Sequence, residues 1–374
     1  MKQFKLLSIL IILICFQGLV GQKKFIISGI LTGFNENSVV KISQNNVVLD
    51  SCVIKNSKFK LTGSLKDTPI NVYLSIQDKK DYIYGALFIG NEKMTLNADK
   101  KDFPFDLLLK GSKYNSLNYE NNQKDKILLH ERKKLEQEVH SLRADNKWND
   151  SLQQAYWGNN EPLGKIKIVD RELDKSRDAF IDAHYNTYYG LYLLEMYKTV
   201  IPKDKLQNYY NKLSPNLKKT DVAIAIKYHL IYPELKLGEK YHNFSAFDKL
   251  DQKKQFSDYF KGKYILLDFS TLYCGFCLEA LPQLENSKKS LNEKLEIITF
   301  YVDKNKVGFD GLLKKHSKDW VMLWDKKGRL SETYAKYKIY GTPTFFLFDP
   351  SGNLIKIFDG YSEDMSEKLN DILK

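Results

Sequence analysis

The chain has 374 residues, enough for two or three domains, and 43% of them are hydrophobic, enough for packed cores. Its formal net charge is +12 at pH 7, but the lysines are scattered among acidic residues instead of forming a stripe. This distribution is typical of a solvated surface, so no nucleic-acid binding is expected, whereas contact with an anionic membrane surface stays open.

The N-terminus has the features of a secretory signal. Two lysines precede an apolar run that extends to Phe16, and small residues follow up to Gly21. The run is shorter than the about 20 apolar residues of a transmembrane helix. We therefore predict a signal peptide at 1–21 and export to the periplasm or cell envelope, with an uncleaved anchor as the alternative. No lipid anchor is expected, because Ile14 precedes Cys15 where a lipoprotein signal has a small residue.

Short apolar or alternating runs occupy the next part of the chain, up to about residue 112. They are rich in Val and Ile and are separated by Asn, Gly and Asp, as antiparallel strands are. The runs are Phe25–Leu31, Val39–Ile42, Val47–Ile54, Phe59–Leu61, Ile70–Ile76, Tyr84–Ile89 and Met94–Leu96. About seven strands in this length predict a small β-sandwich or barrel, which we place at 22–113. Cys52 is interpreted as a small buried strand residue, with a third redox residue as the alternative.

Near Tyr114 the pattern changes to charged segments with leucines at helical spacing. The predicted helices are Leu117–Arg143, Ile166–Val200 and Asp221–Tyr232, and the last two end next to prolines. The tyrosines between 185 and 192 are interpreted as helix packing surface, with a ligand-binding stripe as the alternative. We assign residues 114–238 to a helical spacer.

From residue 239 to 374 strands and helices alternate. The predicted strands are 262–269, Leu295–Val302 and Trp320–Trp324, followed by a hairpin of Thr344–Phe348 and Leu354–Phe358. The predicted helices begin at Cys274 and cover Phe309–His316, Leu330–Tyr337 and Glu363–Leu373. This order predicts an α/β domain, so the whole chain is expected to be a multidomain protein of α+β and α/β parts.

Cys274 and Cys277 are the one close pair among the four cysteines. They lie where a buried strand turns into a helix, and the free N–H groups at a helix start favour negative charge on the first sulfur. Cys274 is therefore the predicted nucleophile, and Cys277 would resolve the mixed disulfide. A passive disulfide is the alternative. No metal is expected, because the pair has no neighbouring histidine and there is no second Cys-x-x-Cys.

Asp268 and Pro282 flank this pair. Asp268 lies six residues before Cys274 on an apolar strand, where a carboxylate is costly. We predict that it accepts and returns the proton of Cys277, with a pKa raised by burial; a carboxylate bonded to backbone at a strand end is the alternative. Pro282 is predicted to bend the helix that begins at Cys274.

These motifs, together with Gly341-Thr-Pro-Thr, resemble the thioredoxin superfamily, and most of all the exported TlpA/ResA-like thiol–disulfide oxidoreductases. The resemblance covers about 241–374 and implies a thioredoxin-like fold there. It implies that Pro343 is cis and packs against the disulfide, and that the backbone of Thr342 binds an extended substrate segment. Tyr273 and Phe276, which replace the usual Trp and Pro, are expected to contact substrate.

The sequence departs from this family after the cysteine pair. Leu278 and Ala280 stand where a basic residue and a glutamate are usual, so no role in tuning the pair is expected for Glu279. The absence of a cation between the cysteines favours a reducing couple. The N-terminal region resembles an uncharacterised β-sandwich domain that often precedes TlpA-like modules.

The resemblance implies an enzyme that reduces disulfides in extracytoplasmic proteins. Its partners would be protein thiols and disulfides and a membrane electron donor. No cofactor is expected besides the redox-active disulfide Cys274–Cys277. A disulfide oxidase or isomerase that uses the same pair is one alternative. A binding protein of the N-terminal domain with a regulatory redox centre is another. A peroxidase is not expected, because Leu267 stands where a proline would be needed.

Overall fold

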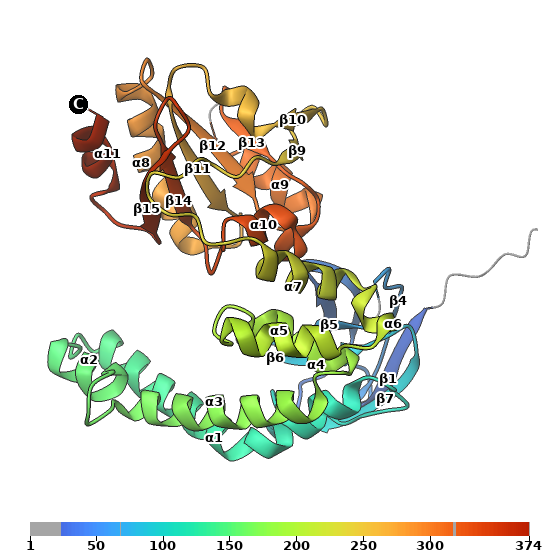
Figure 1. The fold of residues 1–374 in the computed structure, drawn as a ribbon. Helices are drawn as coiled ribbons and strands as arrows, with labels where there is room; N and C mark the ends of the chain where they lie inside the picture. The colour runs from blue at the N-terminus through green and yellow to red at the C-terminus, as the bar shows by residue number, and fades with distance from the viewer. Residues whose placement is uncertain (1–23, 68, 317–318, 374) are drawn as a thin grey trace, which may run out of the picture.

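The computed structural model describes residues 24–67, 69–316 and 319–373. Figure 1 shows an open, C-shaped arrangement of a β-sandwich, a helical region and a C-terminal α/β domain. The α/β domain forms the upper arm, and a long pair of helices, α1 (Asn115–Ala144) and α3 (Lys165–His184), forms the lower arm. The signal peptide predicted at 1–21 lies outside the described residues.

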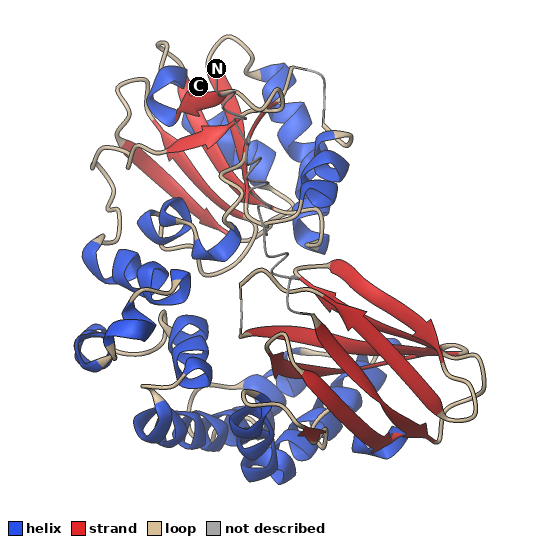
Figure 2. Ribbon diagram, turned by 90° about the vertical axis from the view of Figure 1, so that its right-hand side faces the viewer, coloured by secondary structure: helices blue, strands red, loops and turns tan. Residues whose placement is uncertain are grey.

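The N-terminal domain is a sandwich of two four-stranded sheets, with strand orders β4-β1-β7-β8 and β3-β2-β5-β6 (Figure 2). Its strands are β1 (Phe25–Thr32), β2 (Val39–Gln44), β3 (Val47–Val53), β4 (Lys58–Gly63), β5 (Ile70–Asp78), β6 (Asp81–Ile89), β7 (Lys93–Asp99) and β8 (Leu109–Lys110). Alternate side chains such as Ile27, Val40, Leu74 and Leu96 are fully buried between the sheets. The predicted sandwich is therefore confirmed, and the two-residue strand β8 is an addition to it.

Helices follow the sandwich. Besides α1 and α3 they are α2 (Asp150–Trp157), α4 (Tyr188–Tyr197), α5 (Lys203–Lys212), α6 (Pro215–Lys218) and α7 (Asp221–Ile231). The prediction of one continuous helix from Ile166 to Val200 is wrong, because the chain breaks between α3 and α4. The hydroxyl of Thr187 accepts the N–H of Gly190 at 3.0 Å and caps a new helix.

The tyrosines of α4 pack against the sandwich. Tyr189 is 5% exposed, and its ring centroid lies 5.3 Å from that of Phe88 on β6. Tyr192 contacts the same phenylalanine, with centroids 5.5 Å apart. The packing interpretation of these two rings is confirmed, and they attach the helical region to the outer face of the sheet β3-β2-β5-β6.

The C-terminal domain is built on a five-stranded mixed sheet of order β13-β12-β11-β14-β15. The strands are β11 (Tyr264–Ser270), β12 (Leu295–Tyr301), β13 (Val321–Leu323), β14 (Thr344–Phe348) and β15 (Leu354–Asp359), and a small separate hairpin pairs β9 (Ser245–Phe247) with β10 (Lys253–Gln255). The helices are α8 (Gly275–Ser290), α9 (Lys306–Leu313), α10 (Glu332–Lys336) and α11 (Met365–Leu373). Successive β11 residues Leu266 and Leu267 belong to core clusters on opposite faces of the sheet.

Side chains from all three regions join the domains. Arg329 of the C-terminal domain donates to the buried carboxylate of Glu195 on α4 at 2.6 Å. Asn305, the N-cap of α9, donates through Nδ2 to the carbonyl of Asn45 in the β2–β3 turn at 3.1 Å. The sandwich therefore contacts the C-terminal domain directly as well as through the helices.

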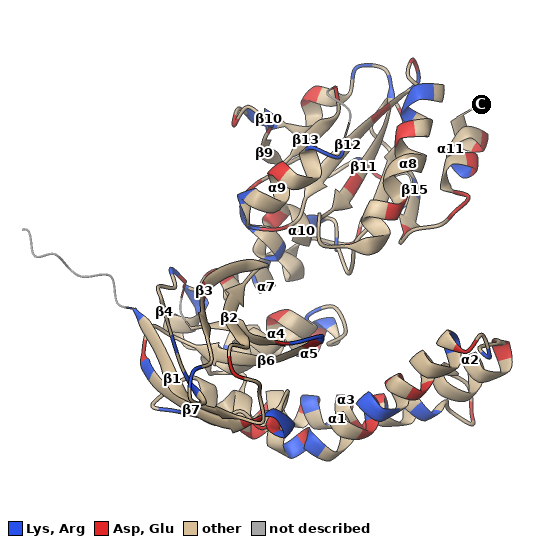
Figure 3. Ribbon diagram, turned by 180° about the vertical axis from the view of Figure 1, so that it is seen from behind, with Lys and Arg blue, Asp and Glu red and all other residues tan. Residues whose placement is uncertain are grey.

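Charged residues of both signs are interspersed along the helices and strands (Figure 3), in agreement with the scattered pattern of the sequence. Among the described residues, no helix has the length and apolar character needed to cross a bilayer.

Candidate active site

The two cysteines lie where β11 leads into α8. Cys274 is the extended N-cap of α8, and its Sγ accepts the N–H of Cys277 at 3.1 Å. Its thiol also donates to the carbonyl oxygen of Thr342, with 3.2 Å between Sγ and oxygen. The peptide bond between Thr342 and Pro343 is cis. The structure thus brings together the cysteine pair and the Thr-Pro segment, which are 65 or more positions apart in the sequence.

The two thiols have different surroundings. Cys274 is half-buried, whereas Cys277 is 1% exposed. Burial raises the pKa of Cys277 to about 12, assisted by its hydrogen bond to Cys274 and by the negative charge of Asp268. At neutral pH Cys277 is therefore a protonated thiol that donates toward Cys274.

Asp268 lies in the middle of the sheet, behind Cys277. Its side chain is 1% exposed, and burial raises its pKa to about 7 in spite of a hydrogen bond from Thr299. The Thr299 hydroxyl donates to Oδ2 at 2.8 Å, and Oδ1 has no hydrogen-bond partner in the described structure. The alternative of a carboxylate bonded to backbone at a strand end does not fit this arrangement.

Thr299 and Trp320 were missed in the sequence and complete the surroundings of this acid. The indole Nε1 of Trp320 donates to Thr299 Oγ1 at 3.0 Å, which leaves the threonine hydroxyl proton for Asp268. Thr299 stands directly beside Asp268 in the parallel register of β11 and β12. The available signal was a threonine between Ile297-Ile298 and Phe300 in a mostly apolar strand.

An aromatic rim surrounds Cys274. Phe276 is 62% exposed and stacks on Tyr361, with ring centroids 6.4 Å apart. Tyr273 is 43% exposed, and its hydroxyl donates to Oδ1 of Asn305 at 3.0 Å. Tyr340, next to the Thr-Pro loop in the sequence, is 61% exposed. Tyr273 and Phe276 are thus exposed next to the cysteine pair, and Tyr361, which the sequence did not indicate, joins them through its stack on Phe276.

The remaining residues singled out in the sequence lie as follows. Glu279 is exposed on α8, and Pro282 lies inside that helix. Cys52 is half-buried on β3 and packs against the sandwich core, and burial raises the pKa of its thiol. Within the described ranges, no three His, Cys, Asp or Glu side chains gather into a group that could hold a metal ion.

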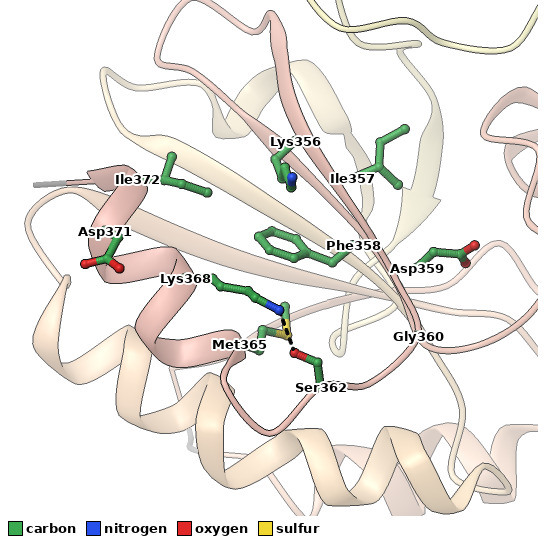
Figure 4. A pocket seen from close by; sticks show the side chains of 10 residues that line it. All are labelled: Lys356, Ile357, Phe358, Asp359, Gly360, Ser362, Met365, Lys368, Asp371 and Ile372. Carbon is green, nitrogen blue, oxygen red and sulfur yellow. Dashed lines mark hydrogen bonds between the residues drawn. The ribbon is translucent and has the colours of Figure 1, made fainter. Parts of the chain in front are cut away.

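A hollow of about 450 Å³ lies between β15 and α11 (Figure 4). Its apolar lining includes Ile357, Phe358, Met365 and Ile372, and Lys368 donates to Ser362 across it. Gly360 also lines it and donates its N–H to the carbonyl of Pro343 at 3.0 Å, so the hollow adjoins the proline loop. Its lining residues include no cysteine.

Two parts of the chain match known protein families. Residues 262–354 match a thioredoxin-like family model, and residues 25–118 match a domain of unknown function (DUF4369). The thiol-disulfide oxidoreductase ResA of Bacillus thuringiensis subsp. konkukian is 28% identical over 142 residues, which cover 38% of this chain and 79% of that protein. ResA of Bacillus subtilis is 24% identical over 139 residues, which cover 37% of this chain and 75% of that protein.

Solved structures are similar to the same part of the chain. A thiol-disulfide oxidoreductase from Bacteroides fragilis is 25% identical with a TM-score of 0.33, covering 36% of this chain and all of that one. The thioredoxin domain of a thiol-disulfide oxidoreductase from Bacteroides vulgatus is 20% identical with a TM-score of 0.35 and covers 38% of this chain. The family model and the ResA homologues show that the C-terminal domain of this chain is thioredoxin-like and similar to the TlpA/ResA-like thiol–disulfide oxidoreductases, and that it follows an N-terminal domain of unknown function.

Proposed function

We propose that this protein reduces disulfide bonds in exported proteins through a Cys274–Cys277 dithiol. The observation that carries the proposal is the asymmetry of the pair. Cys274 is reachable at the start of α8 beside the cis-proline loop, whereas Cys277 is buried beside an acid whose pKa is raised to about 7. A structural disulfide has no use for either feature.

In the first step Cys274 attacks a substrate disulfide. Its sulfur loses its proton to solvent and forms a bond to one substrate sulfur, the substrate S–S bond breaks, and the other substrate sulfur leaves as a thiolate that takes up a proton from solvent. The N–H of Cys277, 3.1 Å from Cys274 Sγ, supports negative charge on the attacking sulfur. The carbonyl and N–H groups beside Pro343 would hold the extended substrate segment next to that sulfur.

In the second step Cys277 resolves the mixed disulfide. Its proton passes to the Asp268 carboxylate, its sulfur bonds to Cys274, and the bond from Cys274 to the substrate breaks. The second substrate sulfur leaves as a thiolate and is protonated, so two electrons have moved from the dithiol to the substrate. An acid with a pKa of about 7 can both accept and return that proton near neutral pH.

The reducing direction and the location complete the proposal. Gly275 and Phe276 place no cation between the cysteines, so nothing there strongly stabilises the reduced pair as an oxidant would need. The signal-like N-terminus supports export to the periplasm or cell envelope, where a membrane electron donor would re-reduce the disulfide.

Replacing Cys277 by Ser tests the proposal. The first step stays possible and the second is lost, so Cys274 should accumulate mixed disulfides with substrate proteins. These are detected as bands on non-reducing gels of the full-length protein that disappear with dithiothreitol. A Cys52→Ser variant is the matched control and should trap nothing. Absence of trapped species in the Cys277→Ser variant, with Cys274 reactive toward a thiol probe, would overturn the proposal.

A further inference from the structure

The sandwich has a partly open sheet edge at β6, the last strand of the order β3-β2-β5-β6. Two asparagines of α1 cover one end of this edge. Asn115 Oδ1 accepts the main-chain N–H of Phe88 at 3.0 Å, and Asn118 Nδ2 donates to the carbonyl of Ala86 at 3.2 Å. The main-chain groups of Phe88 and Ala86 therefore point away from β5.

The other main-chain groups of β6 that point away from β5 follow from the alternating pattern of hydrogen bonds between antiparallel strands. Residues two apart on a strand direct their N–H and C=O groups to the same side. Tyr84 and Tyr82, which stand opposite Ser75 and Gln77 of β5, must therefore also direct their main-chain groups outward. In the described structure no hydrogen bond reaches these groups from a side chain or from another loop. The edge is covered up to Ala86 and open at the two tyrosines.

A groove runs beside this open edge. It has a volume of about 440 Å³ and lies between β6 and the middle of α1, with the segment 103–105 along it. Tyr82 and Tyr84 are 64% and 53% exposed, and their ring centroids are 6.2 Å apart. Tyr73, 46% exposed on β5, lies 6.5 Å from Tyr84. Exposed tyrosines beside unpaired main-chain groups are features of peptide-binding surfaces.

The same sheet is fixed to the redox site. The turn between β2 and β3 begins with Asn45, whose carbonyl accepts from Asn305, and Asn305 accepts from the hydroxyl of Tyr273, next to Cys274. Lys304, the residue before Asn305, also forms an ion pair with Asp67 of the sandwich at 3.6 Å. A polypeptide held on the sheet edge is therefore held in a set orientation to the attacking sulfur.

We infer that the Tyr82–Tyr84 edge of β6 binds an extended segment of the disulfide-containing substrate protein by adding it to the sheet as a further strand. The inference rests on the proposed function for its substrate. Main-chain donors and acceptors at ladder spacing match an extended backbone and no other ligand class. A native globular protein has few free strands to offer, so the substrates so bound are unfolded or non-native chains.

The test measures binding of a fluorescein-labelled peptide of alternating valine and threonine, with a lysine at each end, by fluorescence anisotropy on the full chain. Tyr84→Pro removes one edge N–H without touching the β5 ladder, and Tyr84→Phe keeps the main chain and the ring. The proline variant should bind the peptide about tenfold more weakly, and the phenylalanine variant should bind it as the wild type does. If Tyr84→Pro does not fold, Tyr84→Lys serves in its place, because an edge lysine opposes strand addition.

Oxidised glutathione separates this inference from the proposed function. It has no strand to add, so its reduction should be equal in all three proteins. Equal peptide affinity of the wild type and the folded proline variant, or no peptide binding at all, would overturn the inference. Self-association of the wild type that the proline variant loses would also overturn it, because the edge would then hold a second copy of this chain. Failure of glutathione reduction with edge-dependent peptide binding would overturn the proposed function alone.

Discussion

At the scale of single residues, the site depends on Asp268, whose burial disfavours the charged form of its carboxyl group. Asp268 is buried in the middle of the sheet with one hydrogen bond, from Thr299, and its other carboxylate oxygen has no hydrogen-bond partner among the described residues. The sequence alone predicted this residue, because a carboxylate in an apolar strand is rare without a use. It did not predict Thr299 and Trp320 as its partners, because either residue is ordinary in a core strand or loop until the register is known.

The buried acid should make stability depend on pH. The pKa of Asp268 is about 7 in the folded chain and 3.8 in the reference state, so between these values the folded state binds more protons. The free energy of unfolding should therefore fall as pH rises from about 4 to about 7. Asp268→Asn removes this pH dependence. The free energy of unfolding of the variant should exceed that of the wild type by up to about 4 kcal/mol at pH 8, but not at pH 4. Urea unfolding of the reduced wild type and variant at both pH values measures this difference. A difference that does not depend on pH would contradict the raised pKa of Asp268.

At the scale of elements, strand and helix patterns predicted most strands of the sandwich and of the five-stranded sheet, and most helix positions. They failed where two helices follow each other closely. The apolar pattern continues from α3 into α4, so the break at Thr187 was hidden, although a threonine followed three positions later by glycine was a visible capping signal. Short elements such as α2, β8 and the β9–β10 hairpin were also missed, because a few residues carry no measurable periodicity.

The break between α3 and α4 makes a specific demand on Gly190. A Cβ at this position would lie 1.9 Å from the carbonyl oxygen of His184, so the turn cannot close around a larger residue. Gly190→Ala should lower the free energy of unfolding by about 1–3 kcal/mol through this overpacking. Gly275→Ala is the matched control, because nothing lies within 4 Å of its added Cβ. Chemical denaturation compares the two variants, and equal stability would show that α3 and α4 do not pack as described.

At the scale of the whole molecule, the three regions are joined by polar contacts that no sequence pattern indicates. Asn45 and Asn305 are 260 positions apart, and each is an unremarkable turn or cap residue by itself. The same holds for Arg329 and Glu195, which are 134 positions apart. The motifs identified the thioredoxin-like domain. The contact of the sandwich with Asn305, beside Tyr273 of the site, could be learned only from the structure.

The buried ion pairs of Glu195, which join α4 to the C-terminal domain, can be tested directly. Glu195 is 3% exposed and is shared by Arg329 and by Lys198, whose own pKa is lowered by burial. Glu195→Gln leaves Lys198 buried without a counter-charge and should cost about 3–5 kcal/mol in the free energy of unfolding. Glu172→Gln, which removes an exposed pair with Lys175, should change it by less than about 1 kcal/mol. Thermal or urea unfolding compares the two variants. Equal losses of stability would show that Glu195 is not a buried counter-charge of Lys198 and Arg329.

The measurement that tests the central claim most directly is the reduction potential of the Cys274–Cys277 couple, obtained by equilibrating the full chain in dithiothreitol or glutathione buffers. A reductase of exported disulfides requires a low potential, and we predict a value near that of thioredoxin, about −270 mV. A value near about −120 mV, as in a strong oxidant, would contradict the account and make disulfide formation the reaction of this site.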